Sequence, residues 1–427
     1  MLTLDITTAL AKMITPSHGI PDAEMLAIRT SMRRLVTQWR EECERGEHAW
    51  VQDPYNDAII KQVKETAKRI RSEGIQTVLW IGIGGSALGP KVIQEVFETP
   101  DTIEFIVVDT IDPSVLALYL DIIDWKHACI VVASKSGETL ETVSTFFLFW
   151  EKLTHVLGKQ AASRVIAITD PAEGFLRDFC AEQLIDMLPL PKEVGGRYSI
   201  FTPIGLLPLA LLEGDVSKFI LGAMDMETAS KQERLDENPA AMLASVQYLL
   251  ESKRGYVIRV IMPYIQRLVS LARWNQQLIA ESLGKNEVHN PFPLASIGTQ
   301  DQHSLLQQWT QGPRKSWHLF IHETEKQRVF VPAEVPDGWT HIAGKSFGQL
   351  LDASLAGTSQ GLTAAKRPYV SVSVTRLDEY HLGQLFFCFM AEVVLLGKLY
   401  RIDPYGQPGV EKSKKFTKEI LTRGRGE

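Results

Sequence analysis

The segment CIVVASKSGETLETVSTFFLFW, Cys129 to Trp150, contains a strand, a loop and a helix in succession. Its first five residues, CIVVA, form a short apolar run that is typical of a buried strand. A polar loop with Ser134, Lys135 and Ser136 follows, and a helical pattern of apolar residues then continues to Trp150. This order is the first half of a βαβ unit, whose crossover returns the chain to a parallel sheet. The segment therefore predicts an α/β domain.

Further strand-like runs of the same kind recur at intervals of roughly 20 to 35 residues, with helical patterns between them. They are TVLWIGIG from residue 77, EFIVVDT from 104, CIVVAS from 129, RVIAITD from 164 and IDMLPL from 185. Alternation of short buried strands with helices predicts a parallel sheet that helices cover on both faces. We expect this first α/β domain to span about residues 55–215.

A second group of strand-like runs lies beyond the polar stretch SKQERLDENPAA at residues 230–241. Its members are YVIRVIMPY from residue 256, SWHLFIHE from 316, RVFVPAEV from 328 and YVSVSVTRL from 369. In the polar stretch the charge rises and the apolar periodicity fades, which is typical of a connection between two domains. The apolar run LFFCFMAEVVLLG contains Glu392 and is too short to span a bilayer, so we expect a buried helix there.

The composition excludes several classes of partner. The chain has 427 residues, a net charge of -6 and no long basic block, so we expect neither a nucleic acid nor a membrane surface as partner. The four cysteines share no CxxC spacing, which indicates neither a disulfide framework nor a zinc site. The N-terminus carries Asp5 and no basic flank, unlike a secretory signal. We therefore expect a cytoplasmic protein.

The loop GIGGSALGP, Gly82 to Pro90, follows the first strand and allows three interpretations. Gly82, Gly84 and Ala87 fit the pattern GxGxxA, and Asp109 ends the next strand, as in a dinucleotide-binding site. A phosphate or sugar site is equally compatible, because glycine lets any ligand approach the backbone closely. The third interpretation is a tight turn without a ligand.

The loop SKSGET, Ser134 to Thr139, predicts an anion site. It combines hydroxyl groups with free backbone N–H groups and with the positive end of the dipole of the following helix. Those features suit a single phosphate group. The alternative is that Ser136 or Thr139 simply caps the helix.

Two further segments supply charged residues. Arg197 follows a Gly-Gly pair, and the guanidinium group suits an oxyanion, although a surface loop would also hold an arginine. Glu281 ends an apolar helical pattern, where a partly desolvated carboxylate could act as a base or could simply be solvated. His318 and His322 share one face of a strand but have no third ligand in evidence, so we expect no metal site.

Six motifs follow one another over about residues 75–415, namely GIGGSALGP, SKSGETLET, GGRYSIFTPIGL, AESLGKN, GTQDQHSLLQQWTQGP and DPYGQPGVEKSKK. In their sequence and order they resemble the glucose-6-phosphate isomerase family. The resemblance implies two doubly wound parallel-sheet sugar-isomerase domains with helical N- and C-terminal extensions. We accordingly expect an N-terminal helical extension at 1–54, α/β domains at 55–215 and 216–400, and a C-terminal loop and helix at 401–427.

The same resemblance implies roles for individual residues. Glu281 would move a proton between C1 and C2 of the sugar, His303 and Lys414 would open the ring, and Arg197 would stabilise the enediolate. The implied substrate-binding residues are Gly84, Gly85, Ser86, Ser134, Lys135, Ser136, Thr139 and Gln407. Members of the family are usually homodimers, in which His303 would enter the site of the neighbouring subunit.

The chemistry gives independent reasons for these residue types. Interconversion of glucose 6-phosphate and fructose 6-phosphate moves one proton between neighbouring carbons, so one carboxylate can act as base and then as acid, without a cofactor. A fixed cation stabilises the negative intermediate more than the ground state. Two other functions remain open: an NAD-dependent dehydrogenase that uses the GxGxxA loop, and a non-catalytic sensor of sugar phosphates.

Overall fold

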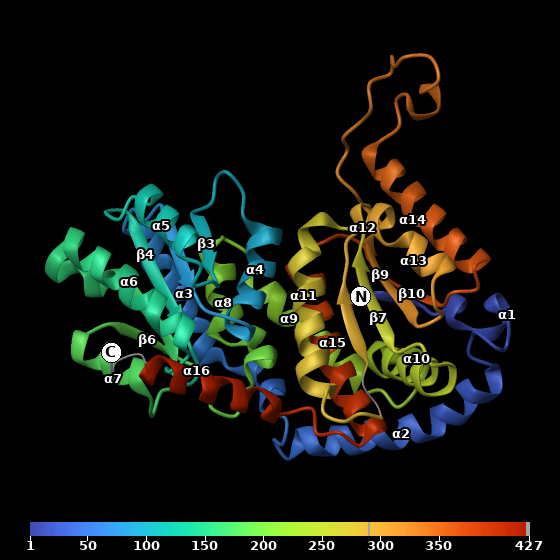
Figure 1. The fold of residues 1–427 in the computed structure, drawn as a ribbon, viewed down its shortest axis with the longest axis horizontal. Coiled ribbons are helices and arrows are strands. Elements are labelled where there is room, and N and C mark those ends of the chain that lie inside the picture. The colour runs from blue at the N-terminus through green and yellow to red at the C-terminus, as the bar shows by residue number, and fades with distance from the viewer. Residues whose placement is uncertain (289–290, 424–427) are drawn as a thin grey trace.

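The computed structural model describes residues 1–288 and 291–423 and contains two five-stranded sheets. Figure 1 shows the sheets in two lobes that lie side by side, with helices α4 (Gly85–Phe97) and α11 (Val269–Leu283) between them. These two helices pack against each other. The α/β class that the sequence predicts is thereby confirmed.

The first sheet has the strand order β3-β2-β4-β5-β6, and all of its strands are parallel. The strands are β2 (Thr77–Ile81), β3 (Glu104–Val108), β4 (Ala128–Ala133), β5 (Val165–Thr169) and β6 (Asp186–Pro189). The helices are α3 (Asp57–Ser72), α4, α5 (Pro113–Ile122), α6 (Leu140–Leu157), α7 (Phe175–Gln183) and α8 (Pro203–Leu211). Each of these five strands coincides with a predicted one. Every residue of β2, β4 and β5 is buried, as the β-branched runs require for strands that are covered on both faces.

The second sheet has the order β1-β10-β9-β7-β8, and only β1 is antiparallel to its neighbour. The strands are β1 (Thr3–Asp5), β7 (Ile258–Pro263), β8 (Phe292–Ala295), β9 (Ser316–Glu323) and β10 (Tyr369–Val374). The helices are α9 (Val216–Ser230), α10 (Pro239–Arg254), α11, α12 (Gln300–Ser304), α13 (Leu306–Gln311), α14 (Phe347–Ala364) and α15 (Glu379–Tyr400). The N-terminal segment is therefore not purely helical, because it also supplies the edge strand of this sheet.

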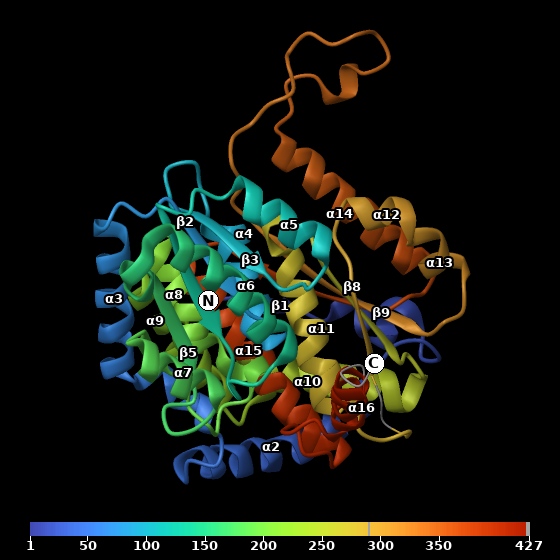
Figure 2. The ribbon, with the colours of Figure 1, turned by 60° about the vertical axis from the view of Figure 1, so that its left-hand side comes forward.

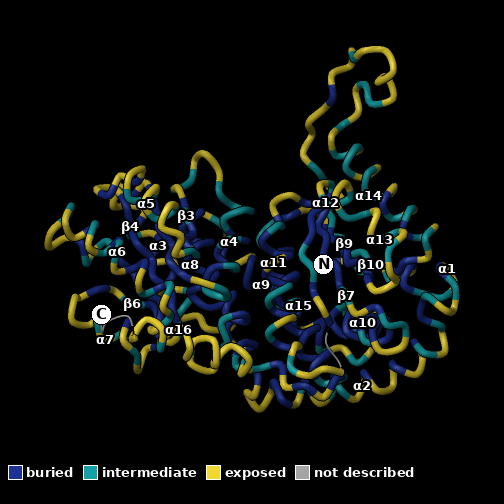
Figure 3. Tube along the Cα trace, viewed as in Figure 1, coloured by how far each residue is buried: buried dark blue, intermediate teal, exposed yellow. Residues whose placement is uncertain are grey.

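The predicted strand RVFVPAEV is wrong. After β9 the chain leaves the sheet as an arm, residues 324–346, whose only element is the short helix η8 (Thr340–Ile342). The arm projects beyond the second lobe at the top of Figure 1, and Figure 3 colours most of it as exposed. Its valines and phenylalanine find no neighbouring strand apart from an isolated bridge between Phe330 and Ser346.

Apart from β1, the two end segments of the chain are mainly helical. The N-terminal segment contains α1 (Ala11–Ile14) and α2 (Asp22–Glu44), and α2 runs along the lower edge of the second lobe in Figure 1. The C-terminal end contains η9 (Pro408–Val410) and α16 (Glu411–Arg423). Helix α16 lies near α7 in Figure 1 but far from it in the turned view of Figure 2, and none of its residues is buried. It therefore projects from the body of the chain.

Helix α15 is the central core helix. By length and composition it is the one helix among the described residues that could cross a membrane, but 89% of its most apolar window is buried inside the protein. It is longer than the apolar run in the sequence suggests, and it packs against α9, α10 and α11. Its Glu392 pairs with Arg259 of β7, and both side chains are completely buried. A buried ion pair of this kind belongs to a protein core.

The order of the strands places the ends of β2 and β4 next to each other. Renumbered along the chain, the first sheet has the doubly wound order 2-1-3-4-5, in which the direction of winding reverses between β2 and β4. Ligands of such sheets bind outside the carboxyl ends of the strands at this reversal. The glycine loop after β2 and the SKSGET loop after β4 both lie there.

The second sheet contains a completely buried histidine, His318, whose protonation the fold disfavours. His318 of β9 is completely buried, and its ring lies 4.7 Å from the ring of Trp309. Burial, with a contribution from the charge of Arg367, lowers the pKa of His318 from 6.5 to about 3. Since the folded state favours the neutral ring, its contribution to stability is complete above pH 6.5 and is lost as the pH falls toward 3.

We therefore expect acidification from about pH 7.5 to about pH 5 to destabilise the wild type by ~2 kcal/mol more than His318→Gln, at ~1.4 kcal/mol per pH unit below 6.5. Urea unfolding curves at the two pH values measure this difference, whatever the variant does to stability at neutral pH. An equal acid loss in both proteins would contradict the assignment.

Candidate active site

The glycine loop packs so closely against its neighbours that side chains do not fit. Gly84 precedes α4 with a φ of 57°, and a Cβ atom there would lie 2.9 Å from Nε2 of Gln277. A Cβ atom on Gly85 would lie 2.2 Å from the backbone carbon of Gly196. Ser86 follows in the first turn of α4, half-buried, and its carbonyl accepts from the indole N–H of Trp80 at 2.8 Å. The glycines therefore let this loop pack against the backbone at Gly196 and against the side chain of Gln277.

The SKSGET loop has the features of an anion site. Ser134 is buried, and its hydroxyl donates to the hydroxyl of Thr139 at 3.2 Å. Ser136 Oγ accepts from the N–H of Glu138 at 3.3 Å. Thr139 is the N-cap residue of α6, but its side chain makes no capping hydrogen bond, so the simple capping interpretation does not hold for Thr139. Within the described residues, the N–H groups of Leu140, Glu141 and Thr142 find no acceptor, as at an open helix start.

Lys135 lies in this loop among other charged groups. Burial lowers the pKa of its ammonium group, and the nearby charges of Arg197 and Lys192 act in the same direction, whereas Glu193 and Asp170 raise it. The loop therefore lies within electrostatic reach of Arg197. The charge of Lys135 and the open start of α6 both favour a ligand with negative charge.

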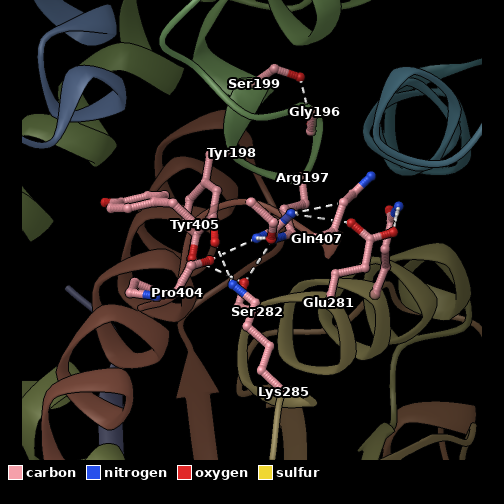
Figure 4. Close-up of polar contacts among 12 residues, drawn as sticks. Gly196, Arg197, Tyr198, Ser199, Glu281, Ser282, Lys285, Pro404, Tyr405 and Gln407 are labelled. Carbon is pink, nitrogen blue, oxygen red and sulfur yellow. Dashed lines mark hydrogen bonds and ion pairs between the residues drawn. The ribbon is translucent and has the colours of Figure 1, made fainter. Parts of the chain in front are cut away.

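Arg197 is buried at the centre of the site and uses all five of its N–H donors (Figure 4). Nε donates to Ser282 Oγ at 2.7 Å, and Nη1 donates to Glu281 Oε2 at 3.3 Å and to Gln407 Oε1 at 3.0 Å. Nη2 donates to the carbonyls of Pro404 at 2.7 Å and Gly406 at 3.0 Å. One guanidinium group thus connects α11 with the C-terminal loop, which we define as Asp403–Gln407.

Glu281 lies near the end of α11 with about a quarter of its side chain open to solvent, at 28%. Its Oε1 accepts from Gln277 Nε2, one turn earlier on the same helix, at 2.8 Å, and its Oε2 accepts from Arg197. Ser282, the next residue, is buried between Arg197 and the hydroxyl of Tyr198, which lies 3.1 Å from its Oγ. The carboxylate is therefore fixed by two donors but still accessible to a ligand.

The C-terminal loop is held on the site by a second cation as well. Lys285 Nζ donates to the carbonyl of Asp403 at 2.7 Å and to that of Tyr405. Burial and the charge of Arg197 lower the pKa of Lys285. Arg197 and Lys285 together bind the carbonyls of four successive residues, which places Gln407 beside Arg197.

Two predicted residues do not join this group within one chain. His303 lies on α12 and is exposed, and no hydrogen bond or ion pair of its side chain occurs among the described residues. Lys414 is exposed on α16 and pairs with Glu411 at 2.9 Å. The single chain therefore assembles Glu281, Arg197, Gln407 and the two loops, but not His303 or Lys414.

Asp109, the acidic residue of the dinucleotide-binding pattern, already has a partner in the structure. The Asp109 carboxylate pairs with Lys91 of α4 at 2.7 Å. Among the described residues, no group of three or more His, Cys, Asp or Glu side chains could hold a metal ion. His318, one of the two histidines considered from the sequence, is buried in the core.

Several residues of the site did not stand out in the sequence. Gln277 carries a detectable signal, because it lies four residues before Glu281 and therefore on the same helix face. Tyr198, Ser282 and Lys285 lie inside quoted motifs, but nothing in their spacing indicates their contacts. Lys285 and Tyr405, for instance, are 120 residues apart.

Comparison with known proteins gives consistent results. The family model described as Phosphoglucose isomerase matches residues 53–426. A glucose-6-phosphate isomerase of Rubrobacter xylanophilus is 32% identical over 97% of this chain and 97% of its own length. That of Methanocaldococcus jannaschii is 34% identical over 86% of this chain and 89% of its own.

Solved structures have the same fold. A Thermus thermophilus protein described only as hypothetical superposes with a TM-score of 0.86 at 28% identity, covering 99% of this chain and all of its own. A glucose-6-phosphate isomerase of Chlamydia trachomatis superposes with a TM-score of 0.78 at 23% identity, over 93% of this chain and 86% of its own.

Proposed function

This chain belongs to the phosphoglucose isomerase family, and we propose that it interconverts glucose 6-phosphate and fructose 6-phosphate through an enediolate. It is an aldose-ketose isomerase, and this reaction belongs to glycolysis and gluconeogenesis. The observation that carries the proposal is the position of Glu281. Its carboxylate is fixed by Gln277 and Arg197, remains partly open to solvent, and belongs to the helix that packs against the glycine loop.

Glu281 is the proposed proton carrier. In the open-chain sugar it takes a proton from one of the two carbons C1 and C2 and delivers a proton to the other, after partial exchange with solvent. A hydroxyl proton moves between O1 and O2 in the same reaction, so no group leaves and no electron acceptor is needed. The hydrogen bond from Gln277 holds one carboxylate oxygen while the other remains near Arg197. A carboxylate that is fixed in this way can contact both C1 and C2 of the bound sugar from one position.

Arg197 is the proposed source of positive charge for the enediolate. All five of its N–H groups have partners in the free protein, so a sugar oxygen binds it either by displacing Glu281 or Gln407 from Nη1 or through charge alone. A fixed guanidinium group at this place stabilises negative charge on the intermediate without reorganising. Gln407, released from Nη1, would then bind the sugar.

The phosphate group is proposed to bind the loop Ser134–Thr139. Its hydroxyl groups, the open start of α6 and the ammonium group of Lys135 supply donors and positive charge. The sugar would extend from there toward Gly84, Gly85 and Ser86 at the start of α4.

Ring opening is proposed to need a second subunit. His303 is exposed and has no contact with Glu281 within the chain, which supports a homodimer in which His303 acts in the neighbouring site. Exposed apolar side chains on two projecting segments support the same assembly, namely Phe330 and Trp339 on the arm and Phe416 and Ile420 on α16. Helix α16 carries Lys414, the proposed partner of His303 in this step.

We also propose a cytoplasmic location. All four cysteines are buried as free thiols, which suits a reducing compartment. A dehydrogenase receives no support from the family or from Asp109, which is paired with Lys91. A non-catalytic sensor would need no base. The carboxylate of Glu281 is held in place by two donors, which favours an enzyme over a sensor.

Glu281→Gln should abolish proton transfer while binding is kept. In deuterated water with fructose 6-phosphate, we expect the wild type to incorporate deuterium at C2 of glucose 6-phosphate, and the variant to lose at least ~100-fold in both label and turnover. NMR measures the label, and competition by a phosphate ester measures binding. Normal turnover by the variant would show that another residue is the base.

The double variant Ser134→Ala/Thr139→Val should weaken substrate binding with little effect on kcat. A hydrogen bond to a charged group contributes ~1.5–3 kcal/mol, so we expect KM to rise at least ~10-fold. Ser144→Ala is the control. It removes an exposed hydroxyl from α6, the helix that follows the loop, and should leave KM unchanged. An unchanged KM in the double variant would place the phosphate elsewhere.

Mixing two inactive variants tests the contribution of the second subunit. If His303 acts in the neighbouring site, a heterodimer of Glu281→Gln and His303→Ala chains contains one intact site and one doubly mutated site. Random re-association of equal amounts should then restore about a quarter of wild-type activity. If both residues act within one chain, each site of the heterodimer lacks one of them and no activity returns.

A further inference from the structure

The C-terminal loop contacts the site through its backbone and leaves one side chain for another purpose. Arg197 and Lys285 bind the carbonyls of Asp403, Pro404, Tyr405 and Gly406. Figure 4 shows the Tyr405 ring pointing away from Glu281. The ring lies between those of Tyr198, with centroids 5.3 Å apart, and His48, 5.8 Å apart.

The Tyr405 hydroxyl is bound by the N-terminal segment, to which the sequence gives no role. His48 Nδ1 lies 2.6 Å from the hydroxyl, and the indole N–H of Trp50 donates to it at 2.9 Å. His48 Nε2 lies 2.9 Å from Glu42 Oε2, and Glu42 also accepts from Lys398 of α15. All three residues are buried: Glu42 lies near the end of α2, His48 directly precedes η2 (Ala49–Val51), and Trp50 lies in η2.

The protonation states of these residues fix the direction of each hydrogen bond in this network. Burial would raise the pKa of Glu42, but hydrogen bonds from Lys398 and His48 lower it, so the carboxylate is ionised and only accepts. Burial lowers the pKa of His48, which is therefore neutral and carries its one proton on Nε2, facing Glu42. Nδ1 must then accept from the Tyr405 hydroxyl, while Trp50 can only donate.

The result is one ordered sequence of donors, Trp50 to Tyr405 to His48 to Glu42, that ends on a carboxylate neutralised by Lys398. Each member has one role, and no other orientation satisfies all of them. A fully satisfied buried network of this kind is rigid and holds its members in one arrangement.

We propose that Glu42, His48 and Trp50 are positioning residues of the active site, which act through the Tyr405 hydroxyl on the loop that presents Gln407 and holds Arg197 by hydrogen bonds. The inference rests on the proposed function, because it names what holds that same site. The loop is fixed from two sides: two cations bind its backbone, and the N-terminal segment binds its one large side chain. Release of the second side lets the carbonyls drift from Arg197, and the guanidinium group then moves relative to Glu281.

Loss of the Tyr405 hydroxyl should lower kcat more than it changes KM. The phosphate group is bound by Ser134–Thr139, which has no contact with Tyr405, whereas Arg197 and Gln407 act on the reacting end of the sugar. A displacement of about 1 Å there costs roughly 100-fold in rate. A residue that only stabilised the fold would instead lower the unfolding temperature without this split.

Tyr405→Phe is the main test, because it removes the hydroxyl and keeps the ring. We expect kcat to fall ~10-fold or more and KM to change less than about 3-fold. Tyr380→Phe is the matched control: its hydroxyl donates to Asp225 at 2.6 Å, away from the site, so its loss should affect stability but not kcat.

Two substitutions of His48 separate its two contacts. An asparagine amide can take the place of Nδ1 and accept from Tyr405, whereas a glutamine amide takes the place of Nε2 and keeps only Glu42. We therefore expect His48→Asn to retain more of kcat than His48→Gln. The reverse order, or an equal loss of kcat in Tyr405→Phe and Tyr380→Phe, would overturn the proposal.

Hydrogen exchange of peptides that cover 403–407 gives a readout without turnover. Tyr405→Phe should accelerate exchange in this loop, and Tyr380→Phe should not. A wild type that does not isomerise fructose 6-phosphate would refute the proposed function, while the exchange data would still decide whether the N-terminal segment holds the loop. Unchanged exchange in Tyr405→Phe would refute the anchoring itself.

Discussion

The buried guanidinium group of Arg197 is the interaction on which the site depends. A buried charge is costly unless it is paired and its hydrogen bonds are satisfied. Arg197 meets this requirement only because three segments converge on it: its own turn after β6, the end of α11 and the C-terminal loop. These segments belong to distant parts of the sequence, since Arg197 and Gln407 are 210 residues apart. The packing of Gly85 against Gly196 adds the glycine loop to the same point.

In the proposed mechanism, the phosphate group and the proton carrier belong to different lobes. The proposed phosphate loop follows β4 of the first sheet, and Glu281 lies on α11, which follows β7 of the second sheet. The packing of α4 against α11 therefore sets the distance between the bound end and the reacting end of the sugar. Glu95 of α4 reinforces this packing, because its carboxylate accepts from the backbone N–H and the hydroxyl of Ser270 in the first turn of α11, at 2.8 and 2.6 Å. A carboxylate at a helix N-terminus is favoured by the helix dipole.

Much of this could be predicted from local sequence. The strands of the first sheet could be predicted because fully buried parallel strands are continuous apolar runs. The two candidate ligand loops follow from where such strands end. The strands β1 and β8 were not visible, since one has three residues and the other contains Pro293. The segment RVFVPAEV has a composition that suits a strand, but in the structure it lies on the arm and joins neither sheet. Asp109 fits the dinucleotide-binding pattern in the sequence, but in the structure its carboxylate forms an ion pair with Lys91.

The contacts that complete the site could not be predicted, because they join residues that are far apart in the chain. His48 and Tyr405 are 357 residues apart, and neither carries a local signal of the other. His303 and Lys414 were named only through resemblance, and within one chain both lie outside the site. Their roles remain predictions that depend on a second subunit.

The most direct measurement is a crystal structure of the Glu281→Gln variant with fructose 6-phosphate bound. We expect the phosphoryl oxygens at hydrogen-bond distance, ~3 Å, from Ser134, Ser136 and Thr139, and C2 within about 3.5 Å of the carboxamide of residue 281. A phosphoryl group bound elsewhere, or a sugar whose C1 and C2 lie beyond the reach of residue 281, would contradict the account.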